Sequence, residues 1–306
     1  MKSKTTLAVV LIVKNEAHNL HQCLTTVAGW VDEIVVMDAG STDKTREIAK
    51  AFNAQVVVNA EWPGFGRQRQ LAQSYVTADW VLWLDADERV TPELRDAILT
   101  QLQIPPDNTL FALPRLSWAF GRFIRHSGWY PDYVVRLYPR TLTSYEPAPV
   151  HEKVMIPHGA QIIRLKGDLL HYPYKDLRHY LSKSAHYAET WAQHQASQTK
   201  TISLAQGILH GIGCFIRMYV FKAGFLDRQQ GLLLALLSAH YTFTKYADFW
   251  VRTHAQASSL NGHFGVGLRL TNSGENGVVW RRGVNRATVC MEVHRNGQIV
   301  YCVMDL

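Results

Sequence analysis

Short apolar runs alternate with segments of helical spacing over the first hundred residues. The apolar runs cover residues 7–13, 33–37, 55–58 and 80–84. Residues 17–27, 43–52 and 67–76 lie between them and have helical spacing. This alternation is typical of βαβ units, in which helices cover a parallel sheet. We therefore predict an α/β fold with a mostly parallel central sheet, whose strands all end at one edge.

The pattern changes after about residue 105. Residues 110–116 and 133–138 read as further strands, and residues 176–195 have helical spacing. Residues 287–304 predict a β-hairpin that turns at Asn296-Gly297. The predicted organisation is a nucleotide-sugar-binding half (1–104), an acceptor-side half of the same domain (105–199), amphipathic helices (200–257) and a short β-rich, Gly-rich tail of unknown role (258–306).

Polar residues follow the predicted strands where those strands end. Asn15 and Glu16 come after the first strand, Asp38 after the second, and Asp85 and Asp87 after the fourth. Open α/β sheets bind their ligands at this edge. No Gly-x-Gly-x-x-Gly or P-loop motif follows any strand, so a dinucleotide or P-loop site is not indicated.

The segment Asp85-Ala86-Asp87 has the chemistry of a metal site. In extended backbone, residues two apart point the same way, so both carboxylates would meet just past the strand end. Such oxygen ligands suit Mg²⁺ or Mn²⁺, which commonly bridge substrate phosphates. The alternative is a solvated acidic turn after a buried strand.

Charge and composition narrow the setting. The net charge is +7 and the pI about 9.2, which fits a phosphorylated substrate, an anionic membrane or nucleic acid. The four cysteines have no metal-ligand or redox spacing, and a reducing cytoplasmic setting is the simplest fit. Residues 200–257 carry six Lys/Arg and two Asp/Glu, a local net charge of +4, among apolar residues. We expect helices that lie on an anionic membrane surface, with core helices or a dimer face as the alternative, and no membrane-spanning helix.

Three segments resemble glycosyltransferase family 2: residues 13–17 around Asn15-Glu16, residues 36–45 around Asp38, and residues 84–88 around Asp85 and Asp87. Residues 129–138, 150–152 and 222–227 make the chain most similar to the lipopolysaccharide inner-core β1,4-glucosyltransferases. In that family Gly often follows the last Asp of 222–227, where this chain has Arg228. The tail after about residue 257 has no counterpart in the resemblance.

The resemblance implies a GT-A fold, a nucleotide-sugar donor and inversion at the anomeric carbon. On this view Asp38 accepts the uracil N3 hydrogen, and Asn15 and Glu16 lie beside the base and ribose. Asp85 and Asp87 then hold the Mg²⁺ or Mn²⁺ and the ribose-diphosphate. Arg67 or Arg69 would reach the diphosphate, or else lie on a solvated helix face. His171 is a candidate third metal ligand, with a structural histidine as the alternative.

Inversion requires a base that takes the proton of the acceptor hydroxyl. Glu152 and Asp132 are the candidates, with Glu152 slightly preferred, and either would otherwise bind acceptor sugar or anchor the fold. Aromatic and basic residues of 115–130, with Trp118, Trp129 and Tyr130 among them, suit an acceptor that carries sugar rings and phosphates. A partly buried aromatic lobe is the alternative.

The leading hypothesis is therefore a metal-dependent inverting hexosyltransferase. It would move glucose from UDP-glucose onto a heptose of lipid-anchored lipopolysaccharide core, at the cytoplasmic face of the bacterial inner membrane. The alternatives are a family member with another lipid-linked or protein acceptor, a nucleotidyltransferase, and a non-catalytic membrane- or nucleic-acid-binding protein. We expect no nucleic-acid partner, because that function leaves Asp38, Asp85 and Asp87 on one edge unexplained.

Overall fold

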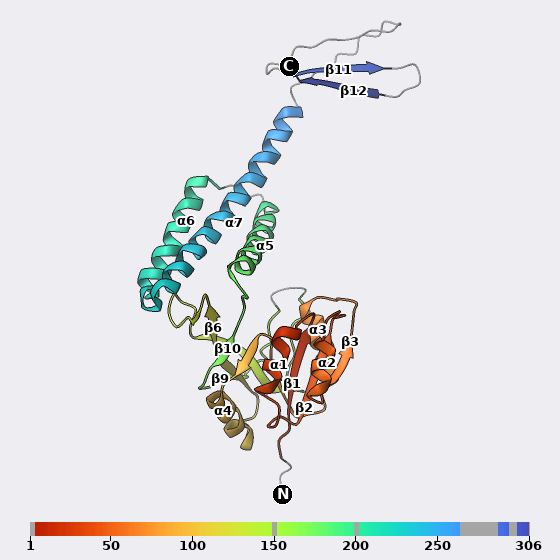
Figure 1. Cartoon of the computed structure of the whole chain (residues 1–306), viewed down its shortest axis with the longest axis vertical. Helices are drawn as coiled ribbons and strands as arrows, with labels where there is room; N and C mark the ends of the chain where they lie inside the picture. The colour runs from red at the N-terminus through yellow and green to blue at the C-terminus, as the bar shows by residue number, and fades with distance from the viewer. Residues whose placement is uncertain (1–3, 149–151, 199–201, 264–286, 294–298, 306) are drawn as a thin grey trace. The chain divides into compact units, whose positions relative to one another are not determined.

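The computed structural model describes residues 4–148, 152–198, 202–263, 287–293 and 299–305. The chain divides into two compact units, residues 1–254 and residues 255–306. The first unit contains a mixed α/β region and a set of helices that follows it (Figure 1). The second contains an antiparallel strand pair, β11 (Ala287–Val293) and β12 (Ile299–Asp305), where the composition predicted a hairpin. The predicted turn at Asn296-Gly297 lies outside the described residues.

The amino-terminal half of the sheet is parallel, as the apolar pattern predicts. Its strands are β1 (Leu7–Val13), β2 (Glu33–Asp38), β3 (Gln55–Val58) and β4 (Trp80–Trp83). They lie in the order β3-β2-β1-β4. The helices between them are α1 (Ala17–Thr25), α2 (Thr45–Ala51) and α3 (Phe65–Ser74) (Figure 1).

Both faces of the sheet are buried at β1. Alternate residues of β1, such as Leu7 and Val9, pack with α1, α2 and α4 (Pro92–Gln103), whereas Ala8 and Val10 pack with α3. A strand with two buried faces reads as a continuous apolar run, and this explains why β1 was recognisable from sequence. The sheet thus fixes the ends of β1, β2 and β4 on a rigid support.

The second half of the sheet is mixed. Its strands are β5 (Glu88–Val90), β6 (Thr109–Ala119), β7 (Arg122–Phe123), β8 (Asp132–Pro139), β9 (Gln161–Arg164) and β10 (Leu169–His171). Strand β8 is antiparallel to both β4 and β6 and continues the sheet from one half to the other. Strand β10 runs parallel to β6 and antiparallel to β5. These pairings bring residues of 115–117, 132–136 and 171 toward the end of β4.

Helices follow the sheet, as predicted. They are α5 (Leu177–Ala196), α6 (Leu204–Ile216), the π-helical turn η1 (Arg217–Phe221), the 3₁₀ turn η2 (Gly224–Asp227) and α7 (Arg228–His263). Helices α6 and α7 approach closely at two glycines. A Cβ on Gly207 would lie 3.1 Å from Tyr246 Cβ, and one on Gly211 would lie 3.2 Å from the Ala239 carbonyl oxygen.

One helical stretch differs from the expectation that no segment could span a membrane. Residues Leu204–Phe221 form a continuous helix that is long and apolar enough to cross a bilayer, by length and composition alone. Gln206, His210 and Arg217 interrupt this stretch, so it contains no long uninterrupted apolar run that would mark it in the sequence. Only 11% of it is buried in the protein, so its apolar side chains are mostly exposed.

Candidate active site

Asn15 and Glu16 join the end of β1 to the loop after β2. Asn15 has φ 55°, a left-handed conformation that asparagine tolerates better than most residues. Its Oδ1 accepts a hydrogen bond from the Thr42 amide at 2.8 Å, and its own amide donates to Ser41 Oγ at 2.9 Å. The Glu16 amide donates to Thr45 Oγ1 at 2.8 Å. The structure therefore places both predicted donor-site residues beside the loop that Asp38 begins.

Asp38 ends β2 and is fully buried. Its Oδ1 accepts hydrogen bonds from the amides of Gly40, at 3.0 Å, and Ser41, at 2.8 Å. Gly40 has φ 82°, which glycine adopts at little cost. Asp38 Oδ2 is buried and has no hydrogen-bond partner among the described residues. An unpaired buried acceptor is costly, so this oxygen suits a ligand that brings a donor.

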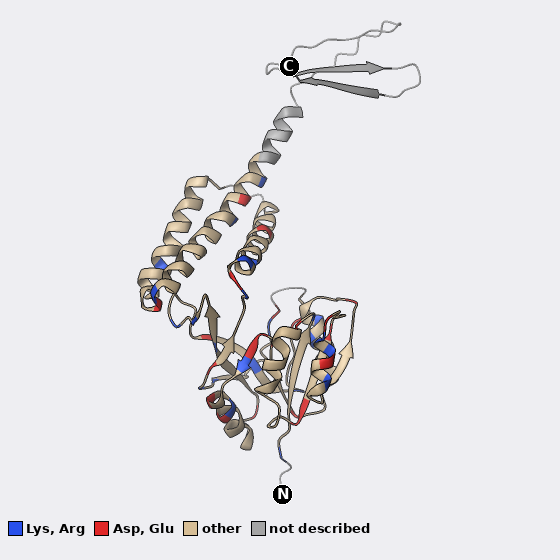
Figure 2. Ribbon diagram, viewed as in Figure 1, with Lys and Arg blue, Asp and Glu red and all other residues tan. Residues whose placement is uncertain are grey.

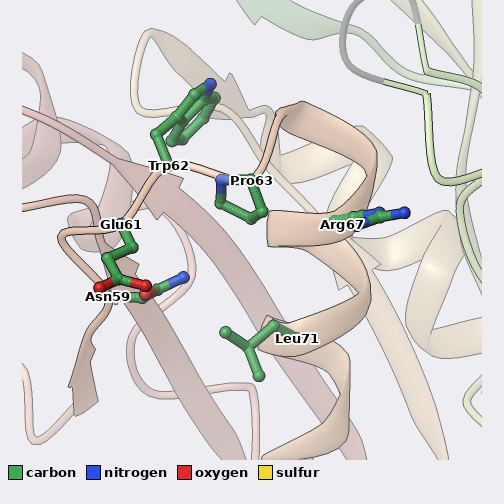
Figure 3. Close-up of a pocket in the computed structure, with 6 residues that line it drawn as sticks. All are labelled: Asn59, Glu61, Trp62, Pro63, Arg67 and Leu71. Atoms are coloured by element: carbon green, nitrogen blue, oxygen red, sulfur yellow. The ribbon is translucent and has the colours of Figure 1, made fainter.

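An open cavity of about 470 Å³ lies at the carboxyl end of β3, next to Asp38 in the sheet. The Asn59 amide donates to the Asp38 carbonyl oxygen at 2.8 Å. Residues from the β3–α3 loop and from α3 line the cavity: Asn59, Glu61, Trp62, Pro63, Arg67 and Leu71. Figure 3 shows that the Arg67 side chain points away from Asn59 and Glu61. Arg67 is exposed and makes no hydrogen bond or ion pair with the described residues, so its predicted contact with a diphosphate stays a prediction.

The segment Asp85-Ala86-Asp87 is a turn between β4 and β5, not an extended strand end. The Glu88 amide donates to the Asp85 carbonyl oxygen at 2.9 Å and closes this turn. The rule that residues two apart point the same way holds for strands and does not apply to this turn, so a metal shared by Asp85 and Asp87 stays a prediction. In the part of the chain that the structure describes, no three His, Cys, Asp or Glu side chains form a metal-binding group.

The Asp85 carboxylate is bound by two arginines. Arg69 donates to its Oδ1 at 2.8 Å, and Arg136 donates to its Oδ2. Burial acts to raise the pKa of Asp85, but the charges of Arg136 and Arg69 outweigh it and hold this pKa well below its usual range. Asp85 is therefore ionised at any ordinary pH and serves to hold two cations at the end of β4.

Arg69 is the arginine of α3 that reaches the site, whereas Arg67 faces solvent. Arg69 is 5% exposed, and its guanidinium lies over the rings of Trp83 and Tyr145, 5.1 and 4.8 Å from their centroids. Its Nε donates to Glu152 Oε1 at 2.9 Å. The remaining nitrogen, Nη1, is buried without a partner among the described residues. Arg69 thus links Asp85 to one of the two candidate bases and keeps one donor free.

Arg136 and Glu88 are site residues that the sequence argument did not identify. Glu88 is fully buried, with Arg136 Nη2 3.2 Å from its Oε1 and the Asp85 amide 2.9 Å from its Oε2. Burial raises the pKa of Glu88 above its usual range, against the charge of Arg136. Both residues lie in segments that carry the family resemblance. That they meet is shown only by the pairing of β4 with β8, in which Leu82 lies opposite Leu137.

Asp87 lies beside His171, whereas Asp85 is bound by Arg69 and Arg136. His171 Nε2 lies 3.5 Å from Asp87 Oδ2, and His171 Nδ1 lies 3.0 Å from Ser117 Oγ. A hydrogen bond at one ring nitrogen fixes the orientation of the other, as in many histidine metal ligands. A carboxylate beside an imidazole suits Mn²⁺ or a similar ion. The donor pair Asp87 and His171 therefore fits the predicted divalent metal, while Asp85 is paired with arginines.

The two candidate bases have different surroundings. Glu152 is 12% exposed and bound to Arg69. Asp132 begins β8, is 44% exposed, and accepts two hydrogen bonds from Arg115, at 2.9 and 2.6 Å. Arg115 also lies 3.7 Å from Glu88, so both candidates connect to the same group of charges. Geometry keeps both as candidates, and Asp132 is the more accessible to an incoming hydroxyl.

Aromatic side chains cluster in the half of the domain that was predicted to face the acceptor. The rings of Trp118 and Tyr172 are 6.2 Å apart, and those of Trp129 and Tyr174 are 6.4 Å apart. Arg125 lies over the Tyr130 ring at 5.2 Å. Trp118, Trp129 and Tyr130 are all half-buried, so this lobe combines ring packing with accessible ring surface.

Comparison with known proteins adds sequence relatives to this geometry. Residues 8–169 match the model of the family described as glycosyl transferase family 2. An uncharacterized glycosyltransferase of Rickettsia prowazekii is 26% identical over 250 residues, which cover 79% of this chain and 85% of that protein. The lipopolysaccharide core biosynthesis glycosyltransferase LpsC of Rhizobium meliloti is 26% identical over 271 residues, or 81% of this chain and 95% of LpsC.

Among solved structures, the glucosyl-3-phosphoglycerate synthase of Mycobacterium tuberculosis, in complex with Mn²⁺ and UDP, is 25% identical. It matches with a TM-score of 0.31 over 39% of this chain and 46% of that one. The family match from residue 8 to residue 169 includes Asn15, Asp38, Asp85 and Asp87.

Proposed function

Because the chain belongs to glycosyltransferase family 2 and has the predicted GT-A fold, we propose that it transfers a hexose with inversion from a UDP-sugar to a lipid-linked acceptor. The proposed donor is UDP-glucose, and the proposed acceptor hydroxyl belongs to a heptose of lipopolysaccharide core. Family membership makes the chain a transferase, so a non-catalytic binding protein is set aside.

The buried free oxygen of Asp38 carries the proposal for a uridine donor. Asp38 Oδ2 lacks a partner in the described residues, and the N3–H of uracil is a donor that would satisfy it. The loop that Asn15 and Thr42 connect would then border the base and ribose. The Asn59–Leu71 cavity lies on the same edge and offers room beside them.

Asp87 and His171 would hold a divalent ion, which when bound supplies positive charge to the leaving diphosphate. Arg69 and Arg136 place further positive charge near this point, and the unpartnered Arg69 Nη1 can donate to a phosphate oxygen. In this proposal Asp85 orients the two arginines. Charge placed in advance where negative charge develops lowers the barrier without reorganisation.

The base takes the proton of the acceptor hydroxyl as its oxygen attacks the anomeric carbon. The bond from that carbon to the diphosphate oxygen breaks on the opposite face, and UDP leaves. Asp132 is the better exposed candidate, and Glu152 is held by Arg69. Their variants separate the two: loss of the base lowers turnover about 10²–10⁴-fold while donor binding persists.

The lipopolysaccharide acceptor is supported by the resemblance to LpsC, whose name places it in core biosynthesis. Membrane attachment is supported by the exposed apolar side chains at the end of Leu204–Phe221, Val220 and Phe221. We place the enzyme at the cytoplasmic face of the inner membrane, where UDP-sugars and the lipid-anchored acceptor meet. Another lipid-linked or protein acceptor is the second candidate, since family 2 membership does not select between them.

The test is transfer by the full chain with Mn²⁺, labelled UDP-glucose and isolated lipopolysaccharide core ending in heptose. Mass analysis should show one added hexose, and nuclear magnetic resonance should show the inverted anomer. Asp38→Asn replaces the free acceptor oxygen and should weaken UDP binding about 10–100-fold, whereas the exposed Asp96→Asn should not. Normal UDP binding by a folded Asp38→Asn protein would contradict the donor assignment.

A further inference from the structure

The end of the α6–α7 helical pair, residues 216–228, exposes large apolar side chains. We refer to these residues as the tip. Phe221 is 78% exposed, and its neighbours Val220, Phe225 and Leu226 are each at least half exposed. Because these side chains come from η1 and η2 in succession, they form one apolar projection and not a scattered set.

Three cations accompany this projection. Arg217, Lys222 and Arg228 are exposed, and their side chains form no hydrogen bond or ion pair within the described part of the chain. The only acidic residue of the tip, Asp227, is fully buried. Its oxygens accept hydrogen bonds from the amides of Arg125 and His126, so it is directed away from solvent. The buried Asp227 thus does not neutralise the exposed cations of the tip. Figure 2 marks Lys and Arg in blue and Asp in red along this stretch.

Arg228 adds evidence of a different kind. Its backbone has φ 57° and ψ −139°, a conformation that favours glycine. A non-glycine residue in such a sparsely populated region costs about 1–3 kcal/mol and is found where function requires it. Within the described part of the chain, no hydrogen bond or ion pair of this exposed side chain explains the cost. Its chemistry is instead that of a phosphate ligand.

We propose that the tip is a membrane-docking element, in which the apolar side chains enter the headgroup region of an anionic bilayer and the three cations bind lipid phosphates. The positive charge of the tip favours anionic lipid over a second copy of the chain as the binding partner. A second copy of the chain would bring the same three cations face to face, whereas anionic lipid complements them. Charge also selects the tip over the α6 side: Leu204–Ile216 exposes Leu209 and Ile212 but contains no Lys or Arg.

The tip is fastened to the acceptor side of the site. Besides the Asp227 bonds, the Ser127 amide donates to the Lys222 carbonyl oxygen at 2.9 Å. A Cβ on Gly224 would lie 2.6 Å from Ser127 Oγ, so the two segments fit only with glycine there. Docking would therefore hold the loop that leads to Trp129 and Tyr130 close to the lipid surface. This last step rests on the proposed lipid-linked acceptor, whereas docking itself does not.

The experiment is cosedimentation of the full chain with vesicles of phosphatidylcholine that contain roughly one-third phosphatidylglycerol, compared with pure phosphatidylcholine. Binding to the anionic vesicles only, weakened by salt, is expected. The double variant Phe221→Ser/Phe225→Ser should weaken binding at least about tenfold. Arg217→Gln, Lys222→Gln and Arg228→Gln should each weaken it about fivefold, the effect of one basic residue near the surface.

Leu209→Ser is the matched control, because Leu209 is 67% exposed and lies on α6 outside the tip. It should bind vesicles as the parent does, and all variants should keep the parent's melting temperature. Equal loss in Leu209→Ser and the Phe variant, equal binding to neutral vesicles, or a dimer that the tip variants dissociate would overturn the proposal. Vesicle binding without any UDP binding would leave docking intact and refute the proposed function instead.

Discussion

Arginines in two regions of the first unit have opposite surroundings. Arg69 and Arg136, at the end of β4, are buried and bound to Asp85, with further contacts to Glu152 and Glu88. Arg217 and Arg228, at the tip, are exposed and have no acidic partner among the described residues. The same side chain is therefore held by internal carboxylates in one place and is free of them in the other.

The energies involved differ as much as the surroundings. Removing one partner of a buried ion pair leaves an uncompensated charge and costs about 3–5 kcal/mol. Exposed charges contribute about 0–1 kcal/mol to folding stability, so changing them is tolerated. We therefore expect variants at the end of β4 to act on folding and catalysis together, and variants that remove only a charge at the tip to act on binding alone.

The largest effect is expected for Arg136→Ala. It leaves Glu88 fully buried and Asp85 with Arg69 only, and should lower the free energy of unfolding by about 3 kcal/mol or more. Urea denaturation measures this. The control Arg95→Ala removes an arginine whose side chain is 42% exposed and pairs with Asp96, and it should change stability by less than about 0.5 kcal/mol. Similar losses in both proteins would remove the contrast between buried and exposed charges.

His171→Ala tests the pair of Asp87 and His171, which contains no arginine. If Asp87 and His171 hold the metal, Mn²⁺-dependent transfer should fall about 100-fold or more, with no comparable change in stability. Ser117→Ala, which removes the partner of Nδ1, should weaken Mn²⁺ binding about tenfold. The exposed His158→Ala is the control. Unchanged Mn²⁺ titration of His171→Ala by calorimetry would show that the metal lies elsewhere.

The sequence predicted features that depend on neighbouring residues, and it did not predict features that depend on contacts between distant segments. Strands β1, β2 and β4 were predictable because each is a short apolar run with two buried faces, and β3 was predictable as the apolar run Gln55–Val58 even though it is partly exposed. The turn at Asp85-Ala86-Asp87 was not, because the apolar run continues through Leu84 and gives no sign of where extended backbone ends. The arginine partners of Asp85 come from α3 and β8, and only the tertiary pairing of β8 with β4 brings Arg136 there.

The donor residues show the same limit at a smaller scale. Asp38 was placed correctly at the end of β2, because local strand and loop chemistry decide its position. That its Oδ2 lacks a partner depends on surrounding packing, which the sequence does not reveal. Likewise, the sequence did not show which of Arg67 and Arg69 would be buried, because the exposure of a helix residue can be predicted only when the surface that the helix packs against is known.

Gly66→Ala should disturb the site through the backbone. A Cβ on Gly66 would lie 1.9 Å from the Glu146 carbonyl oxygen, so residues 146–148, which precede Glu152, must move. We expect a loss of about 1–3 kcal/mol in stability and reduced transfer. Gly213→Ala, also in a helix but with nothing within 4 Å, should stabilise the protein by up to about 1 kcal/mol. Equal melting temperatures of the two variants would contradict the close contact at Gly66.

The smallest effect on folding is expected at the tip, and it has the opposite sign. Arg228→Gly should raise the free energy of unfolding by about 1 kcal/mol, because glycine adopts φ 57° without strain, while binding to anionic vesicles falls about fivefold. Arg228→Lys keeps both the charge and the strain, so it should leave stability and vesicle binding near those of the parent. Urea denaturation and cosedimentation on the same preparations measure the two properties. A stabilised Arg228→Gly protein that binds vesicles as tightly as the parent would mean that the strain at Arg228 serves some purpose other than lipid binding.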